Sequence, residues 1–199
     1  MVSLVLGVFL FLLFLCFHVY DQVFLSPYSF HFGLWTNPLK ELALSGGAFV
    51  MAASFPEEKS LPGNKLLLLL GRILFSIMLI VFGIDHFLYT EFVAKLVPGW
   101  IPGSVFWTYF GAVALIGSGV CIMLNIKINL VGILLGTMLF LWFIMLHIPR
   151  AIAEPNIEKG NEITSVFQAL AFSGIAFLLS ALCPAKEPAI NVNPAAQRN

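Results

Sequence analysis

Four histidines are the main candidates for chemistry in this chain, and three of them stand beside a charged residue. The pairs are His18 with Asp21, Asp85 with His86, and His147 with Arg150. Imidazole can donate or accept a hydrogen bond near neutral pH, so such groups could bind a quinone carbonyl or a lipid headgroup. A metal site is the poorer interpretation, because no two histidines have the i, i+3 or i+4 spacing that places two ligands on one helix.

The residues around these histidines are strongly apolar. Residues 9–21 and 139–150 are aromatic-rich runs that end on His18 and His147. Of the 199 residues, 60% are hydrophobic and only 10% are charged, whereas soluble domains carry about 25% charged residues. The chain is therefore predicted to be an integral membrane protein in contact with membrane lipids. Zero net charge without a basic cluster makes nucleic acid an improbable partner.

The predicted fold class is all-α, integral to the membrane, with six transmembrane helices. A spanning helix needs about 20 mostly apolar residues, and six segments meet or approach that length. They are 2–24, 38–55, 66–89, 104–124, 129–149 and 162–183. We divide the chain into a two-helix part (1–60), a four-helix membrane domain (61–183) and a polar tail (184–199).

The first two segments look like a second copy of the last two. LGVFLFLLFLCFH (6–18) aligns with LGTMLFLWFIMLH (135–147), which places His18 on His147. LALSGGAFVMAAS (42–54) likewise aligns with LAFSGIAFLLSAL (170–182). Small residues let helix backbones approach closely in lipid. We therefore predict helix packing at six glycines, which are Gly7, Gly46, Gly47, Gly132, Gly136 and Gly174.

Six spans place both termini on one side of the membrane, and a small excess of basic residues there predicts that this side is cytoplasmic. The histidines fall at the opposite, outer end. Ionisable groups at membrane depth need a partner or water, so we predict that Asp21 or Asp85 forms a salt bridge with Arg150. Two interpretations of this end stay open. In one, the polar groups only mark the membrane interface. In the other, they line a pocket floored by aromatic side chains (Phe87, Trp100, Trp107 and Trp142).

The four later segments resemble the DoxX-like family of small bacterial membrane proteins. The resemblance covers about residues 67–183. Its motifs are GRILFSIMLIVFGIDHF (71–87), LVPGWIPGSVFWTYFGAVALIGSGV (96–120), LHIPR (146–150) and SGIAFLL (173–179). It implies a four-helix membrane domain in a bacterial cytoplasmic membrane, associated with membrane redox systems. The positions that match its polar motif are Asp85, His86, His147 and Arg150. The two additional helices at the start depart from the family pattern.

Three functions remain open at this point. The leading one is an accessory subunit of a membrane complex that is linked to quinone, with other membrane-protein subunits as partners. Its candidate ligand site for a quinone or phospholipid comprises His18, Asp85, His86, Trp100, His147 and Arg150. The second is a component that reduces or oxidises quinone directly, and the third is a small-solute transporter. No nucleophile, phosphate-loop or dinucleotide motif occurs, so no residue is predicted to be catalytic and no metal is expected.

Overall fold

The computed structural model of the chain describes residues 1–28, 31–55, 63–153, 155–156 and 160–183. Within these ranges the regular structure is entirely helical, in agreement with the predicted class. The longer helices are α1 (Val2–Leu13), α2 (Thr36–Ser54), α3 (Gly63–Leu88), α5 (Ser104–Met123), α6 (Ile128–Trp142) and α8 (Asn161–Leu182). Shorter helices are α4 (Thr90–Leu96) and α7 (Ile148–Ala153). The predicted tail lies outside the described residues.

Among the described residues, five helical stretches are long and apolar enough to cross a membrane, which is the pattern of an α-helical membrane protein. They are Val2–Leu25, Asn64–Leu88, Ser104–Met123, Ile128–Ala153 and Asn161–Leu182. The first continues α1 through two π-helical turns, η1 (Phe14–Val19) and η2 (Asp21–Leu25). The fourth joins α6 to α7 through a third, η4 (Phe143–His147). All five correspond to segments predicted from the sequence.

The remaining predicted segment, 38–55, forms α2. Its composition alone does not qualify α2 as a membrane span. Its polar first turns, which contain Lys40 and Glu41, lower its hydropathy. The packing explains how such a helix is accommodated. Because α2 contacts α1, α3 and α8, little of it has to face lipid. Its buried side chains belong to the same core as those of α3 and α8, so one core joins residues on both sides of the boundary predicted at residue 60.

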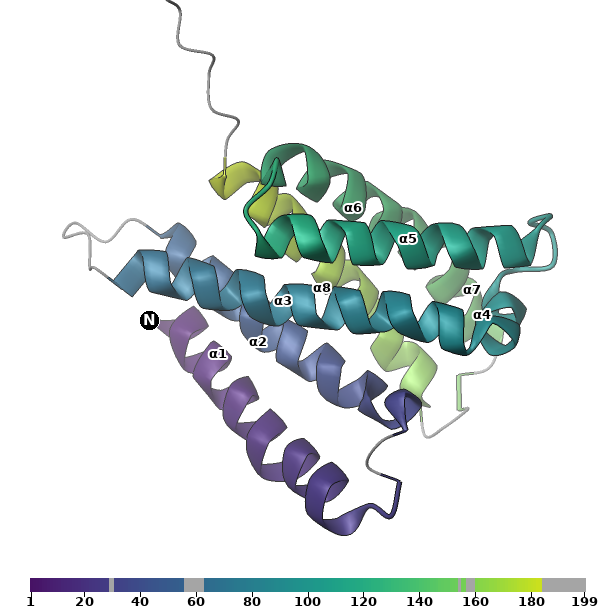
Figure 1. Ribbon diagram of the computed structural model, residues 1–199, viewed down its shortest axis with the longest axis horizontal. Coiled ribbons are helices and arrows are strands. Elements are labelled where there is room, and N and C mark those ends of the chain that lie inside the picture. The colour runs from purple at the N-terminus through teal and green to yellow at the C-terminus, as the bar shows by residue number, and fades with distance from the viewer. Residues whose placement is uncertain (29–30, 56–62, 154, 157–159, 184–199) are drawn as a thin grey trace, which may run out of the picture.

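The helices are arranged as a ring with one helix added outside it (Figure 1). Contacts run from α2 to α3, then to α5, α6 and α8, and from α8 back to α2. Phe75 and Leu79 of α3, Leu115 of α5, and Ala176 and Leu179 of α8 are almost completely buried within this ring. Helix α1 packs on the outside of α2, and only 11% of its span is buried. It is therefore the most peripheral of the long helices.

Glycines mark the closest helix crossings, as predicted for five of the six positions. A Cβ on Gly46 would lie 2.8 Å from the carbonyl oxygen of Gly71, so α2 and α3 cross backbone to backbone. A Cβ on Gly132 would lie 2.6 Å from the carbonyl oxygen of Ala176 in α8. Gly7, Gly47 and Gly136 each face a side chain of a neighbouring helix at similarly short range.

The prediction for Gly174 is wrong. A Cβ at this position would meet no atom within 4 Å. The alignment with Gly46 placed it on a packing face, but Gly46 is needed because α3 crosses α2 there. No helix crosses α8 closely at the corresponding point, so a side chain could be accommodated.

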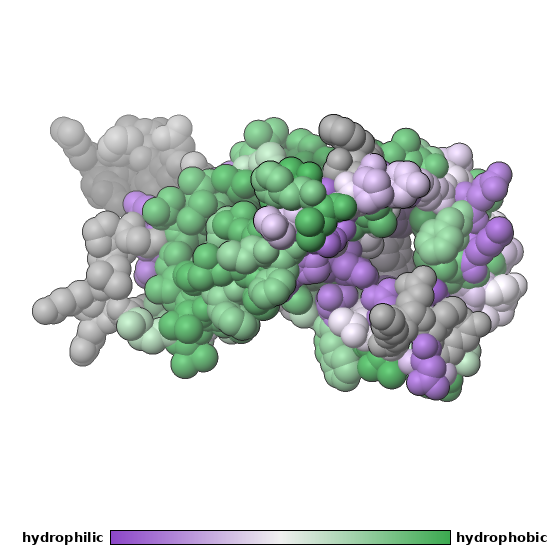
Figure 2. Space-filling model, turned by 90° about the horizontal axis from the view of Figure 1, so that it is seen from below, coloured by the Kyte–Doolittle hydropathy of each residue, from purple (hydrophilic) through white to green (hydrophobic). Residues whose placement is uncertain are grey.

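The histidines gather at one end of the bundle, where α1, α3 and α6 finish and α2, α5 and α8 begin (Figure 1). We call this the histidine end. It also holds α4, α7 and the first turns of α2 and α8. On the face shown in Figure 2, hydrophilic side chains concentrate toward this end and hydrophobic ones cover the opposite part. This distribution fits a helix bundle whose apolar part could lie in lipid and whose polar end is in contact with water.

Candidate functional site

A histidine and a carboxylate from different helices form the first polar contact of the histidine end. His18 lies in the π-helical turn that continues α1, and Glu41 lies in the second turn of α2. His18 Nε2 is 2.7 Å from Glu41 Oε2, and the Glu41 side chain is 19% exposed. A π-helical turn is uncommon, and it often occurs where a side chain must be redirected for function. This contact ties the far end of the peripheral helix to the ring.

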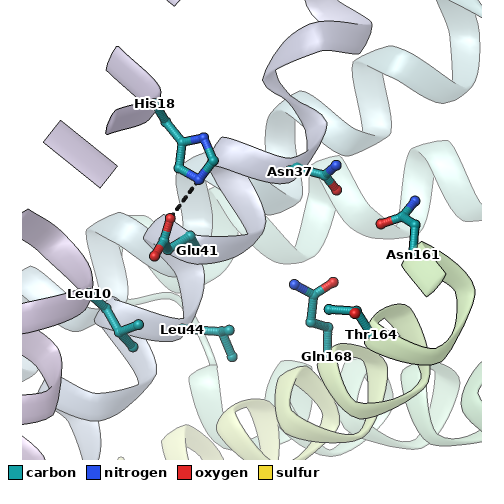
Figure 3. Close-up of a pocket in the computed structure, with 8 residues that line it drawn as sticks. All are labelled: Leu10, His18, Asn37, Glu41, Leu44, Asn161, Thr164 and Gln168. Atoms are coloured by element: carbon teal, nitrogen blue, oxygen red, sulfur yellow. Dashed lines mark ion pairs between the residues drawn. The ribbon is translucent and has the colours of Figure 1, made fainter. Parts of the chain in front are cut away.

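This ion pair forms one wall of a pocket between α1, α2 and α8 (Figure 3). The pocket has a volume of about 290 Å³. Its polar lining residues are His18, Asn37, Glu41, Asn161, Thr164 and Gln168, and its apolar ones are Leu10 and Leu44. In Figure 3 the side chains of the three helices surround a common open space. The Oε1 atom of Gln168 is buried there and has no hydrogen-bond partner within the described part of the chain.

A second set of polar contacts lies between α2, α7 and α8. Lys40 Nζ donates to Asn37 Oδ1 at 3.2 Å and to Ser165 Oγ at 3.3 Å, and the second bond joins α2 to α8. Arg150 of α7 donates to Glu162 of α8 at 2.5 Å. Their side chains are 26% and 12% exposed, so this ion pair is partly shielded from water and should stabilise the fold more than an exposed pair would.

The predicted salt bridge between Arg150 and Asp21 or Asp85 is wrong. Glu162 follows Arg150 by twelve residues and begins α8 directly beside α7, so the local connection brings the two together. Asp21 begins η2, in the stretch that continues α1, and Gln22 Nε2 donates to it. Asp85 lies on α3, and both of its carboxylate oxygens are buried without a hydrogen-bond partner among the described residues.

His86 belongs to a third cluster, between α3, α5 and α6. Its ring stacks on Trp142 at a centroid distance of 6.2 Å, and its Nδ1 lies 2.7 Å from the carbonyl oxygen of Phe82. The neighbouring His31 stacks on Tyr89 at 5.5 Å and lies within electrostatic range of Asp85. This cluster combines the Asp85 carboxyl group, which has no hydrogen-bond partner among the described residues, with aromatic rings.

The structure therefore separates the residues that the sequence grouped as one site. His147 lies near Lys40 and Arg150, and its buried Nδ1 has no hydrogen-bond partner among the residues that the structure describes. His18 lies across α2 in the pocket, and His86 lies on Trp142. Trp100 is 67% exposed in the turn before α5 and does not line the pocket. Within the described part of the chain, no three His, Cys, Asp or Glu side chains gather as metal ligands would.

Sequence reasoning missed the three residues that organise this end, Glu41, Glu162 and Gln168. A signal for the two glutamates was present, because each stands in the first or second turn of an otherwise apolar helix. A carboxylate in that position requires a cationic or hydrogen-bonding partner, and the nearest candidates were His18 and Arg150. Nothing in the sequence distinguished Gln168, because its importance depends on which face of α8 meets α1 and α2.

Corresponding positions of the two aligned segments make corresponding contacts. Ser45 Oγ donates to the carbonyl oxygen of Gly7 at 2.8 Å, and Ser173 Oγ donates to that of Gly136 at 2.9 Å. In the alignment Ser45 falls on Ser173 and Gly7 on Gly136. The π-helical turns η1 and η4 also begin at aligned positions.

Comparison of this chain with protein-family models, with curated proteins and with solved structures found no match.

Proposed function

We propose that the chain is a DoxX-like protein of the bacterial cytoplasmic membrane that crosses the bilayer six times, with α2 as the sixth crossing and both termini in the cytoplasm. The 19 residues of α2 are close to the length that a span requires. The burial of α2 between three helices supports the proposal, because a shielded helix can carry polar residues that lipid would not accept. We further propose that α1 and α2 repeat α6 and α8, which the equivalent serine–glycine bonds support.

Cysteine accessibility tests the six crossings. In a chain with its native cysteines replaced, we would place single cysteines at Val2, Leu124 and Gly99. If α2 crosses the membrane, Val2→Cys and Leu124→Cys react with an impermeant thiol reagent only after the cells are permeabilised, whereas Gly99→Cys reacts in intact cells. Labelling of Val2→Cys and Leu124→Cys from opposite sides would show that α2 does not cross.

We infer that the protein acts as an accessory subunit of a quinone-linked membrane complex. The observation that carries this proposal is the use of polar groups at the histidine end. His18 binds Glu41, Lys40 binds Ser165, and Arg150 binds Glu162. Five ionisable side chains that could perform chemistry there hold helices together instead. A chain whose polar groups hold its own helices together is suited to a structural role beside a partner subunit.

The apolar outer surface is consistent with such a role. Helix α1 exposes Val5 and Phe9, and α5 exposes Phe106, Tyr109 and Phe110. These side chains can face either lipid or the helices of a partner. To test the proposal, membranes solubilised in a mild detergent would be separated by native gel electrophoresis. An accessory subunit migrates in an assembly well above the 21.9 kDa of the chain. Migration as the free chain, together with turnover of a substrate by the purified protein, would contradict the proposal.

A further inference from the structure

We propose that the pocket between α1, α2 and α8 binds the uncharged, hydroxyl-bearing head of a small amphiphile dissolved in the membrane. Such a head could belong to a quinol or to a neutral glycerolipid, and both offer hydroxyl hydrogens to acceptors in the pocket. This inference goes beyond the accessory role, because it concerns a ligand of the isolated chain rather than a partner.

The polar lining converges from three helices. Asn37 and Glu41 lie one turn apart on α2, and Thr164 and Gln168 lie one turn apart on α8. Residues four apart occupy the same face of a helix, so each helix presents two polar side chains to the pocket. His18 closes the third side through its contact with Glu41 (Figure 3). An arrangement of amide, hydroxyl and carboxylate groups around one space is suited to hydrogen-bonding a polar head.

The apolar lining indicates where the rest of the ligand lies. Leu10 precedes His18 by two turns on α1, and Leu44 follows Glu41 by about one turn on α2. Both are therefore farther from the histidine end than the polar groups, toward the apolar length of the bundle. A molecule with its polar head at the end of the bundle and its tail along the leucines matches this gradient. Its tail would leave between α1 and α8, each of which packs on α2.

Charge argues against an anionic head. The lining contains one carboxylate, Glu41, and no lysine or arginine. A phosphate placed there would face the Glu41 carboxylate. The lysine beside this wall, Lys40, already donates to Asn37 Oδ1 and Ser165 Oγ. A hydroxyl group, in contrast, can donate to a carboxylate oxygen of Glu41.

An unpartnered acceptor in the wall supports the same head chemistry. The Oε1 atom of Gln168 is buried, and no described residue provides it with a hydrogen bond. Leaving a buried acceptor unsatisfied costs about 1–3 kcal/mol. If the Gln168 side chain turns toward the pocket, a ligand hydroxyl can satisfy this acceptor. The volume of about 290 Å³ is just below the range for ligand sites, about 300–1,000 Å³. It fits a single head group rather than a whole amphiphile.

The test is native mass spectrometry of the purified full chain in detergent, titrated separately with decylubiquinol, dioctanoylglycerol and dioctanoylphosphatidic acid. We expect a saturable adduct of one molecule with at least one of the two uncharged probes, and the probe that binds identifies the source. Equal or tighter binding of the phosphatidic acid, or no saturable adduct with either uncharged probe, would overturn the proposal. Because no partner is present, this result is independent of the accessory role.

Two matched variants locate the adduct. Gln168→Leu removes the unpartnered acceptor of the pocket. Gln22→Leu makes the same chemical change at a second glutamine whose Oε1 is buried without a partner but which does not line the pocket. We expect Gln168→Leu to weaken binding about tenfold, which corresponds to the loss of one hydrogen bond, and Gln22→Leu to leave it unchanged. Equal effects of the two substitutions would place the ligand elsewhere and refute the assignment.

Discussion

Replacing Gly46 with alanine should destabilise the bundle, because the new methyl group would enter the crossing of α2 and α3. Its Cβ would lie 2.8 Å from the carbonyl oxygen of Gly71 and 3.0 Å from Leu74 Cβ. The atom in the way is backbone, so it cannot rotate aside and the two helices must move apart. Overpacking of this kind costs about 1–3 kcal/mol, while the better helix propensity of alanine returns up to about 1 kcal/mol.

Gly174→Ala is the matched control, because it gives the same gain in helix propensity without a contact within 4 Å. The difference between the two variants therefore isolates the overpacking term of about 1–3 kcal/mol. With about 2–4 °C of Tm for each kcal/mol in a chain of this size, Gly46→Ala should melt about 2–12 °C below Gly174→Ala. The assay is thermal unfolding in detergent followed by far-ultraviolet circular dichroism. Equal melting temperatures would refute the close α2–α3 crossing.

The other predictions concern polar groups, and the same unfolding assay measures each of them. Ser45→Ala and Ser173→Ala should each lower the free energy of unfolding by about 0.6 kcal/mol, as is typical of a hydrogen bond between membrane helices; clearly unequal losses would argue against equivalent helix pairs. Arg150→Met should cost about 1–3 kcal/mol, because it leaves the partly buried Glu162 without its partner. The double change Arg150→Met with Glu162→Leu should restore most of that loss, and no recovery would contradict the pairing. Asp85→Asn should leave stability unchanged or raise it, since both carboxylate oxygens are buried without a hydrogen-bond partner among the described residues; a strong loss of stability would show that Asp85 has a hydrogen-bond partner in the folded protein.

The sequence predicted the helices well, because long apolar runs bounded by proline, glycine and polar residues allow few other structures in a membrane. The ends of α5 and α8 lie within one residue of the predicted segments. The position of α2 was harder to predict. Its hydropathy is low because its first turns contain Lys40 and Glu41, and these charges are tolerated because each has a partner on another helix. A hydropathy profile contains no information about partners.

The polar site was predicted less well, and the reason is physical. The sequence shows that Arg150 needs a carboxylate, but not which helix end lies beside it. The pairing with Glu162 depends on the direction in which the chain turns after α7. Similarly, Gly46 and Gly174 occupy equivalent positions, and only the neighbouring helix distinguishes them. Contacts within one helix can be predicted from the spacing of residues in the sequence. Contacts between two helices can be predicted only when the packing of the helices is known.

Native mass spectrometry of the protein extracted gently from its own membranes tests the accessory role most directly. The measurement would record the chains that accompany it and their stoichiometry. We expect recovery in a fixed ratio with the subunits of a quinone-linked membrane complex. Recovery of the chain alone, with catalytic activity of its own, would contradict it.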